Sequence, residues 1–387
     1  MTLTELSLIK LKIPFKVSFK HSSAERSMTQ SILVAARSAS GNIGLGEGCP
    51  REYVTHETVE SATAFFENQR EILLGTIHSL ASLQDFVQNT EALIDSNPAA
   101  WCAIELALLD LLAKENKQSL EKILGLPQLN GNFRYTAVLG DATWDKFVLQ
   151  VKQYLAMGFQ EFKLKISGNL SDDLKKIALL QELGKGNLKL RVDANNIWQD
   201  SGTAIDYFKQ FGIRLLGIEE PLAAMQFEQL SKVAEGTQTK IILDESFLNK
   251  SHFDSIQKIA PSFIINIRIS KMGGLLRSLE IARMAGELAL PIIVGAQVGE
   301  TSLLTRAALT VAHTNKRNLL AQEGAFGTLL LKYDIVNPPL MFRRRGLLDP
   351  KAFLKPDEYG MQLSYQFNKI NGLQNRQVGY KSVAQNP

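Results

Sequence analysis

Three short stretches decide the fold: LKLRVDANN (188–196), LLGIEEP (215–221) and IILDES (241–246). Each is an apolar run rich in leucine or β-branched residues, which is typical of a buried parallel strand. Each run leads into an acid that follows the previous one by about 25 residues, the length of one strand, one helix and two loops. The three acids are Asp193, Glu219 and Asp244.

The acids are expected to lie together, because the carboxyl ends of parallel barrel strands converge on one face. Three carboxylates in one place repel one another unless a cation lies between them. Ligands that are all oxygen favour a hard ion, with Mg²⁺ first and Mn²⁺ as an alternative. Each acid taken alone could instead cap the helix that follows its strand. The repeated spacing favours a metal site.

The same pattern extends over residues 131–340. Eight apolar runs occur there, and amphipathic stretches such as TWDKFVLQVKQYLAMG (143–158) separate most of them. Alternating strands and helices predict an α/β fold, a (β/α)7-8 TIM-type barrel. An open doubly wound sheet is the alternative, but no glycine-rich phosphate loop follows a first strand.

The flanking regions have a different pattern. Residues 1–130 read as strands followed by helices, which predicts an α+β capping domain. Two polar or glycine-rich loops, 18–27 and 44–57, interrupt it. Residues 341–387 are rich in loops, and we expect this C-terminal tail to return to the capping domain and complete it. YGMQLSYQF (359–367) is the candidate for a last strand.

The composition excludes several classes of protein. The 387 residues have a net charge of +4, and their basic residues are scattered, so no nucleic-acid partner is expected. The N-terminal segment has lysines inside its apolar run and matches neither a signal peptide nor a membrane span. Two cysteines, Cys49 and Cys102, have no metal-site spacing. We therefore expect a cytoplasmic protein that acts on a small molecule and lies on no membrane.

A pair of lysines is expected on the barrel interior. Lys163 and Lys165 are two apart in one run, so their side chains point to the same side of a strand. Two buried ammonium groups need anionic partners, and each lowers the pKa of the other. A lysine tuned in this way can act as a general base. The alternative is an exposed pair at a strand edge.

Further polar residues follow the sixth to eighth runs. Arg268 lies in the sixth run, where a guanidinium stays protonated and can hold negative charge. Lys271 is expected in the loop before Gly273. Glu323 ends the eighth run, where it would contact substrate or pair with a lysine, and Gln297 ends the seventh.

This set of residues resembles the enolase superfamily, and most closely its muconate-lactonizing subgroup. The likeness lies in the KxK pair, the three acids on successive strands and the VDAN and IEEP signatures, and it extends over nearly the whole chain. That subgroup includes cycloisomerases, o-succinylbenzoate synthases, N-acylamino-acid racemases and dipeptide epimerases.

The resemblance implies a role for each residue. Asp193, Glu219 and Asp244 would bind Mg²⁺, Lys165 would remove a proton α to a carboxylate, and Lys163 would hold that carboxylate. The loops 18–27 and 44–57 would close over the barrel mouth and select a small-molecule carboxylate substrate. Barrels of this kind often form homo-oligomers. The candidate substrate-binding residues are Ser23, Arg51, Asn195, Gln297 and Glu323.

The chain departs from the subgroup in ways that separate three hypotheses. Arg268 stands where the subgroup usually has a lysine, and the Asp-x-Asp pair of dipeptide epimerases is absent near Glu323. One-base cycloisomerisation or syn elimination with Lys165 is therefore preferred. The alternative is a racemase or epimerase of N-acyl amino acids or dipeptides. A barrel that binds metal and ligand without catalysis is a third hypothesis.

Overall fold

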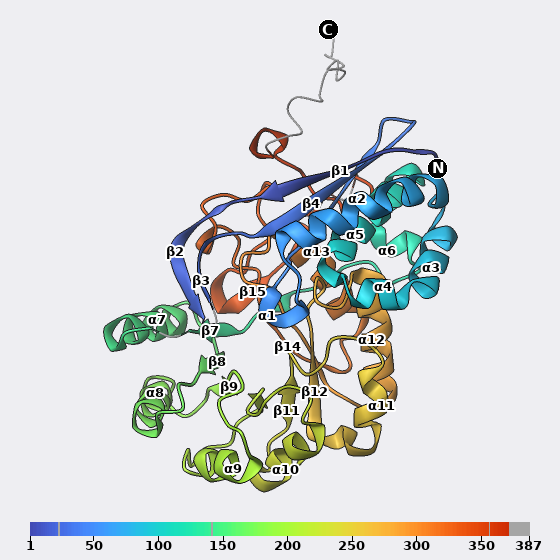
Figure 1. Cartoon of the computed structure of the whole chain (residues 1–387). Coiled ribbons are helices and arrows are strands. Elements are labelled where there is room, and N and C mark those ends of the chain that lie inside the picture. The colour runs from blue at the N-terminus through green and yellow to red at the C-terminus, as the bar shows by residue number, and fades with distance from the viewer. Residues whose placement is uncertain (22–23, 141, 356, 371–387) are drawn as a thin grey trace.

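The computed structural model describes residues 1–21, 24–140, 142–355 and 357–370. Its centre is an eight-stranded sheet in which every neighbouring pair is parallel and the order follows the chain (Figure 1). A backbone hydrogen bond of 2.8 Å from Thr136 to Gln322 links the last strand to the residue before the first. The eight strands are β7 (Ala137–Leu139), β8 (Glu161–Lys165), β9 (Lys189–Asp193), β10 (Gly217–Glu219), β11 (Ile241–Leu243), β12 (Phe263–Ile267), β13 (Ile292–Val294) and β14 (Leu319–Gln322).

These strands coincide with the eight apolar runs, so the predicted barrel is confirmed. Strands β10, β11 and β12 are buried along their whole length, which explains why their sequences do not alternate with polar residues. Helices cover the outside of the sheet (Figure 1). They are α7 (Trp144–Ala156), α8 (Leu170–Leu183), α9 (Ser201–Lys209), α10 (Phe227–Thr237), α11 (His252–Ile256), α12 (Leu275–Glu287) and α13 (Ser302–Thr314).

The capping region lies above the barrel in Figure 1. Its three-stranded antiparallel sheet has the order β1-β4-β5, and a separate hairpin joins β2 to β3. Its strands are β1 (Leu3–Leu11), β2 (Pro14–His21), β3 (Ala24–Met28), β4 (Ser31–Ser38) and β5 (Ile43–Gly48). Its helices are α1 (Glu52–Thr55), α2 (Val59–Thr76), α3 (Leu80–Asn89), α4 (Glu91–Asp95), α5 (Pro98–Glu115) and α6 (Leu120–Ile123).

Helix α5 packs directly on β5 because glycines leave room for it. A Cβ atom on Gly46 would come within 2.1 Å of the carbonyl oxygen of Ala103. Almost the whole of α5 is buried as a result. This close packing places the loop after β5 against the barrel.

Buried acids of the capping region bind the ends of barrel helices. Glu47 accepts hydrogen bonds from the backbone N–H (3.0 Å) and hydroxyl (2.7 Å) of Thr301, which caps α13. Glu105 accepts one from the N–H of Leu276 in the first turn of α12 (3.0 Å). Because each acid satisfies donors that a helix leaves unpaired, the cap and barrel are joined by specific contacts.

The described part of the C-terminal segment contacts the capping region at Gly360 but forms no strand there. Gly360 pairs with Ser119 and Tyr365 with Val336 only as isolated bridges, so the predicted strand over 359–367 is wrong. The reason is local: Gly360 has φ of 71° and Gln362 of 59°, values that break an extended backbone.

Several short elements lie outside the two main sheets. β6 (Phe133–Arg134) pairs with β15 (Leu347–Leu348). The 3-10 helices are η1 (Gln257–Ser262), η2 (Gly327–Leu329), η3 (Arg344–Gly346), η4 (Pro350–Ala352) and η5 (Phe367–Lys369). Among the described residues, no helix is both long and apolar enough to cross a membrane.

Candidate active site

The predicted acids and the base lie in one row of the sheet. Lys165 is in register with Asp193, and Asp193 is in register with Glu219. In-register residues of neighbouring parallel strands point to the same face, which here is the barrel interior. Asp244 directly follows β11, the next strand. The structure therefore brings the three acids and Lys165 to the carboxyl ends of four neighbouring strands.

Lys163 is buried among acids. Its Nζ atom lies 2.7 Å from Glu323, 3.0 Å from Glu219 and 3.9 Å from Asp193. Burial alone would lower the pKa of Lys163, but the attraction of Glu219 and Glu323 outweighs it and holds the pKa above its usual range. Lys163 therefore carries a fixed positive charge at the site.

Lys165 has the opposite environment. It is 9% exposed, and its buried Nζ atom has no hydrogen-bond partner among the described residues. Burial lowers the pKa of Lys165, Asp193 opposes this, and the charge of Lys163 lowers it further. An unpaired amine with a lowered pKa can accept a proton from a bound substrate.

Arg268 contacts two of the acids. Its Nη2 atom contacts Asp244 and lies 3.8 Å from Glu219, while Nη1 donates a 3.1 Å hydrogen bond to Gln297. Burial would lower the pKa of Arg268, but the acids, Asp244 first, raise it above its usual range. Arg268 therefore holds its proton and supplies positive charge.

Lys271 lies in the turn before Gly273, as expected, and its side chain also contacts the site. Its side chain is fully buried and donates to the Asp244 carboxylate (2.9 Å), the Asp244 carbonyl (2.7 Å) and the Asn266 carbonyl (2.8 Å). The turn that follows, with φ of 77° at Gly273, folds the chain back toward the strand ends.

Arg191 is a site residue that the sequence analysis missed. Its Nη1 atom lies 2.9 Å from Glu323 and its Nη2 atom donates to Thr136 at 2.8 Å. Arg191 precedes Asp193 by two residues in β9, so the spacing rule used for the lysine pair would have found it. Burial would raise the pKa of Glu323, but Lys163 and then Arg191 lower it below its usual range. Glu323 thus has two cationic neighbours, although its Oε1 atom accepts no hydrogen bond from the described residues.

The remaining candidates have different positions. Gln297 is buried beside Arg268. Asn195 has a φ of 46°, and its backbone N–H donates a 3.2 Å hydrogen bond to the carboxylate of Asp193. Arg51 is buried, and its guanidinium donates to the carbonyls of Gln30 (3.1 Å), Pro50 (2.6 Å) and Val298 (2.6 Å). Ser23 lies outside the described residues.

The donor set suits a hard divalent cation, because Asp193, Glu219 and Asp244 offer only oxygen. Burial first, and then the neighbouring acids, raise the pKa of Glu219 to about 8 despite the opposing charge of Lys163. A further positive charge would reduce the repulsion between Glu219 and the neighbouring acids. In the described part of the chain, no three acid, histidine or cysteine side chains are arranged to hold an ion. Lys163 and Arg268 bridge the carboxylates instead.

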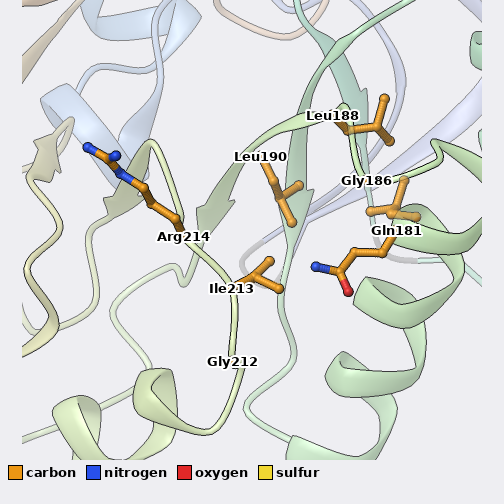
Figure 2. Close-up of a pocket in the computed structure, with 8 residues that line it drawn as sticks. Gln181, Gly186, Leu188, Leu190, Gly212, Ile213 and Arg214 are labelled. Atoms are coloured by element: carbon orange, nitrogen blue, oxygen red, sulfur yellow. The ribbon is translucent and has the colours of Figure 1, made fainter.

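A pocket of about 330 Å³ lies elsewhere, at the amino ends of the strands (Figure 2). Leu190, near the start of β9, lines it together with Gln181 of α8 and Ile213 of the loop before β10. Arg214 is the one charged residue in its lining. Since Asp193 ends the same strand, the pocket is at the opposite end of the barrel from the acids.

Comparison with known proteins agrees with the fold. The Bacillus cereus "N-succinyl-L-Arg/Lys racemase" is 26% identical over 87% of this chain and 90% of its own length. The Cytophaga hutchinsonii "D-Ala-D/L-Ala epimerase" is 27% identical over 97% of this chain and 99% of its own length. The crystal structure of a Cytophaga hutchinsonii dipeptide epimerase complexed with Mg and D-Ala-L-Val has a TM-score of 0.83 at 25% identity, and covers 96% of this chain and 98% of that one.

Two family models match the chain, one over the capping region and one over the barrel. Residues 3–125 match the mandelate racemase / muconate lactonizing enzyme N-terminal domain. Residues 146–352, more than half of the chain, match the enolase C-terminal domain-like model. The protein therefore belongs to the mandelate racemase/muconate lactonizing enzyme family of the enolase superfamily.

Proposed function

We propose that the protein is a Mg²⁺-dependent isomerase that removes the proton α to a carboxylate and racemises or epimerises an N-acyl amino acid or a dipeptide. One observation carries the proposal: the unpaired amine of Lys165 lies in the same row of the sheet as Asp193 and Glu219, inside the barrel mouth.

The chain's own residues account for most of the chemistry. Lys165 takes the α-proton, and the fixed charge of Lys163 lies beside it to attract the substrate carboxylate. Asp193, Glu219 and Asp244 would hold Mg²⁺, whose charge stabilises the enediolate when it is bound. Lys271 keeps the Asp244 carboxylate in one orientation, since it binds both that carboxylate and the adjacent backbone.

The relatives favour racemisation or epimerisation over the preferred sequence-based hypothesis of cycloisomerisation or elimination. The two curated relatives described above are named as a racemase and an epimerase, and the matched Cytophaga structure contains Mg and a dipeptide. Inversion needs proton transfer on both faces of the substrate carbon. On the face opposite Lys165 in this barrel lies β12, and Arg268 is the residue that directly follows this strand.

A one-base reaction is the second candidate, and Arg268 is the observation that favours it. A guanidinium paired with Asp244 is a poor proton acceptor. Arg268 would then act only by stabilising negative charge, and Lys165 would carry out every proton transfer.

The test is α-proton exchange in deuterated solvent, screened over both enantiomers of N-acyl amino acids and over dipeptides. We expect Mg²⁺-dependent deuterium uptake, lost with chelator and restored by added Mg²⁺, together with slower inversion. Exchange in one enantiomer without any inversion would select the one-base candidate. Absence of exchange across the whole set, with Mg²⁺ present, would contradict both.

A further inference from the structure

Asp244 differs from the other two acids of the site because it lies outside the strand ladder. Asp193 ends β9 and Glu219 ends β10, so the register of the sheet fixes both. Strand β11 ends at Leu243, one residue before Asp244. A contact other than the ladder is therefore needed to hold Asp244 where it can share an ion with the other two.

The carboxylate of Glu220 supplies this contact. Glu220 directly follows Glu219 and is fully buried. Its Oε1 atom accepts hydrogen bonds from the backbone N–H groups of Asp244 (2.6 Å) and Ser246 (2.8 Å), and its Oε2 atom accepts one from the hydroxyl of Ser246 (2.7 Å). Because these three donors are neutral, Glu220 binds the chain after β11 through hydrogen bonds and not through an ion pair.

The backbone of Glu220 is bound to both neighbouring strand ends. Its N–H donates to the carbonyl of Ile242 in β11 (3.2 Å), and its carbonyl accepts from the N–H of Asn196 (2.7 Å), three residues after Asp193. Its φ of 40° is unfavourable for a residue with a Cβ atom, and such a conformation persists where the surrounding contacts determine it. Glu220 thus joins the ends of β9, β10 and β11, the strands that lead to the three acids.

Lys271 binds Asp244 from the other side of the same peptide. It donates to the carbonyl of Asp244 (2.7 Å) and to its carboxylate (2.9 Å), while Glu220 accepts from the N–H of Asp244. Both polar groups of the Asp244 backbone therefore bind buried side chains. A carboxylate on a backbone held in this way has little freedom to adjust to a larger ion.

We infer that Glu220 is a positioning residue, which holds Asp244 so that the three acids fit a small divalent cation in preference to a large one. The inference rests on the proposed metal site and adds its selectivity. Mg²⁺ requires oxygens at about 2.0–2.1 Å in near-ideal octahedral geometry, whereas Ca²⁺ accepts distances of about 2.3–2.6 Å and flexible geometry. Loss of the Glu220 contacts should therefore weaken the binding of Mg²⁺ more than that of Ca²⁺.

The test is calorimetric titration of the full chain, freed of metal with a chelator, with MgCl₂ and with CaCl₂ at constant ionic strength. Glu220→Met keeps a side chain of similar size but leaves the N–H groups of Asp244 and Ser246 without this acceptor. We expect the variant to bind Mg²⁺ about 10- to 100-fold more weakly, the range for groups that orient metal ligands, and Ca²⁺ within about threefold of the wild type.

Glu220→Gln separates hydrogen bonding from charge. The amide oxygen of glutamine can accept from both backbone N–H groups, and its NH₂ group can donate to the hydroxyl of Ser246, which is both donor and acceptor. This variant should therefore bind Mg²⁺ within about fivefold of the wild type, because it keeps the contacts. A loss as large as that in Glu220→Met would show that the charge matters instead of the contacts, and would overturn the inference.

The matched control is Asp334→Leu. Asp334 is a buried acid after β14 that also binds two backbone N–H groups, of Ser302 (3.1 Å) and Val336 (3.0 Å), and one hydroxyl, of Ser302 (2.8 Å). Its replacement should lower the melting temperature, as Glu220→Met does, but leave both metal affinities unchanged. An equal loss of Mg²⁺ affinity in this control, or equal losses for Mg²⁺ and Ca²⁺ in Glu220→Met, would overturn the inference.

Ser246→Ala is the milder variant if Glu220→Met does not fold. It removes one of the three donors to Glu220 and should weaken Mg²⁺ binding by a smaller factor that still exceeds the factor for Ca²⁺. Equal factors would count against the positioning role.

Crystal structures of the metal-free wild type and of the variant that folds give a readout that needs no bound ion. We expect the backbone of Asp244 to shift in the variant while Asp193 and Glu219 stay in place. An unshifted Asp244 would overturn the inference. Absence of Mg²⁺ binding by the wild type, together with a shifted Asp244 in the variant, would overturn the proposed function and leave the positioning role supported.

Discussion

Replacing Lys165 with alanine is expected to slow α-proton exchange by about 1000-fold, within the range found for general bases. The amine of Lys165 is the buried, unpaired nitrogen in the row that also holds Asp193 and Glu219. Alanine removes it without removing a hydrogen bond to any described residue, so folding should be little affected. The measurement is deuterium uptake by NMR with the best substrate of the screen.

The control for this experiment is binding. Lys165→Ala should retain its affinity for Mg²⁺ and for the substrate within a few-fold, because the acids and Lys163 remain in place. Exchange at the wild-type rate in Lys165→Ala would show that another group is the base. A parallel loss of Mg²⁺ affinity would instead indicate a structural role for this lysine.

Replacing Arg268 with lysine is expected to speed inversion of the substrate by about 100-fold, the contribution typical of a second acid–base group. A guanidinium keeps its proton, whereas a lysine has an ordinary pKa near 10.4, which burial lowers further. The new amine could give and take a proton on the face opposite Lys165. The measurement is the rate of loss of optical activity, compared with the rate of deuterium uptake in the same sample.

Arg268→Met is the matched control because it keeps an unbranched, flexible side chain but has neither charge nor donors. It should lower both exchange and inversion, since the positive charge beside Asp244 is lost. If Arg268→Lys also lowered both rates, a lysine at this position would not supply the missing acid–base group, and the account of slow inversion would be wrong.

The barrel could be predicted because its signals are local and repeated. Each strand is a short apolar run, and each acid directly follows or ends one of three neighbouring runs, as at Asp193 and Glu219. Side chains at the carboxyl ends of parallel barrel strands converge on one face irrespective of the conformation of the loops, so their proximity follows from the topology. The two-residue spacing of Lys163 and Lys165 sufficed in the same way to place both inside.

The ion pairs within the site could not be predicted from spacing alone. Lys271 contacts Asp244 from the turn that follows β12, and the path of this turn depends on the conformation of its glycines. The pairing of Glu323 with Arg191 joins β9 to the end of β14, two strands far apart in sequence. The segment 359–367 has a strand-like pattern, but positive φ values at Gly360 and Gln362 prevent a strand.

The central claim is that Asp193, Glu219 and Asp244 hold one divalent cation opposite the amine of Lys165. Crystals soaked in Mn²⁺ test it most directly through anomalous scattering. We expect one strong peak per chain, with an oxygen from each of the three acids at about 2.2 Å, close to the distance typical of small divalent ions. A saturated crystal with no peak there, in which Arg268 and Lys163 still bridge the carboxylates, would contradict the claim.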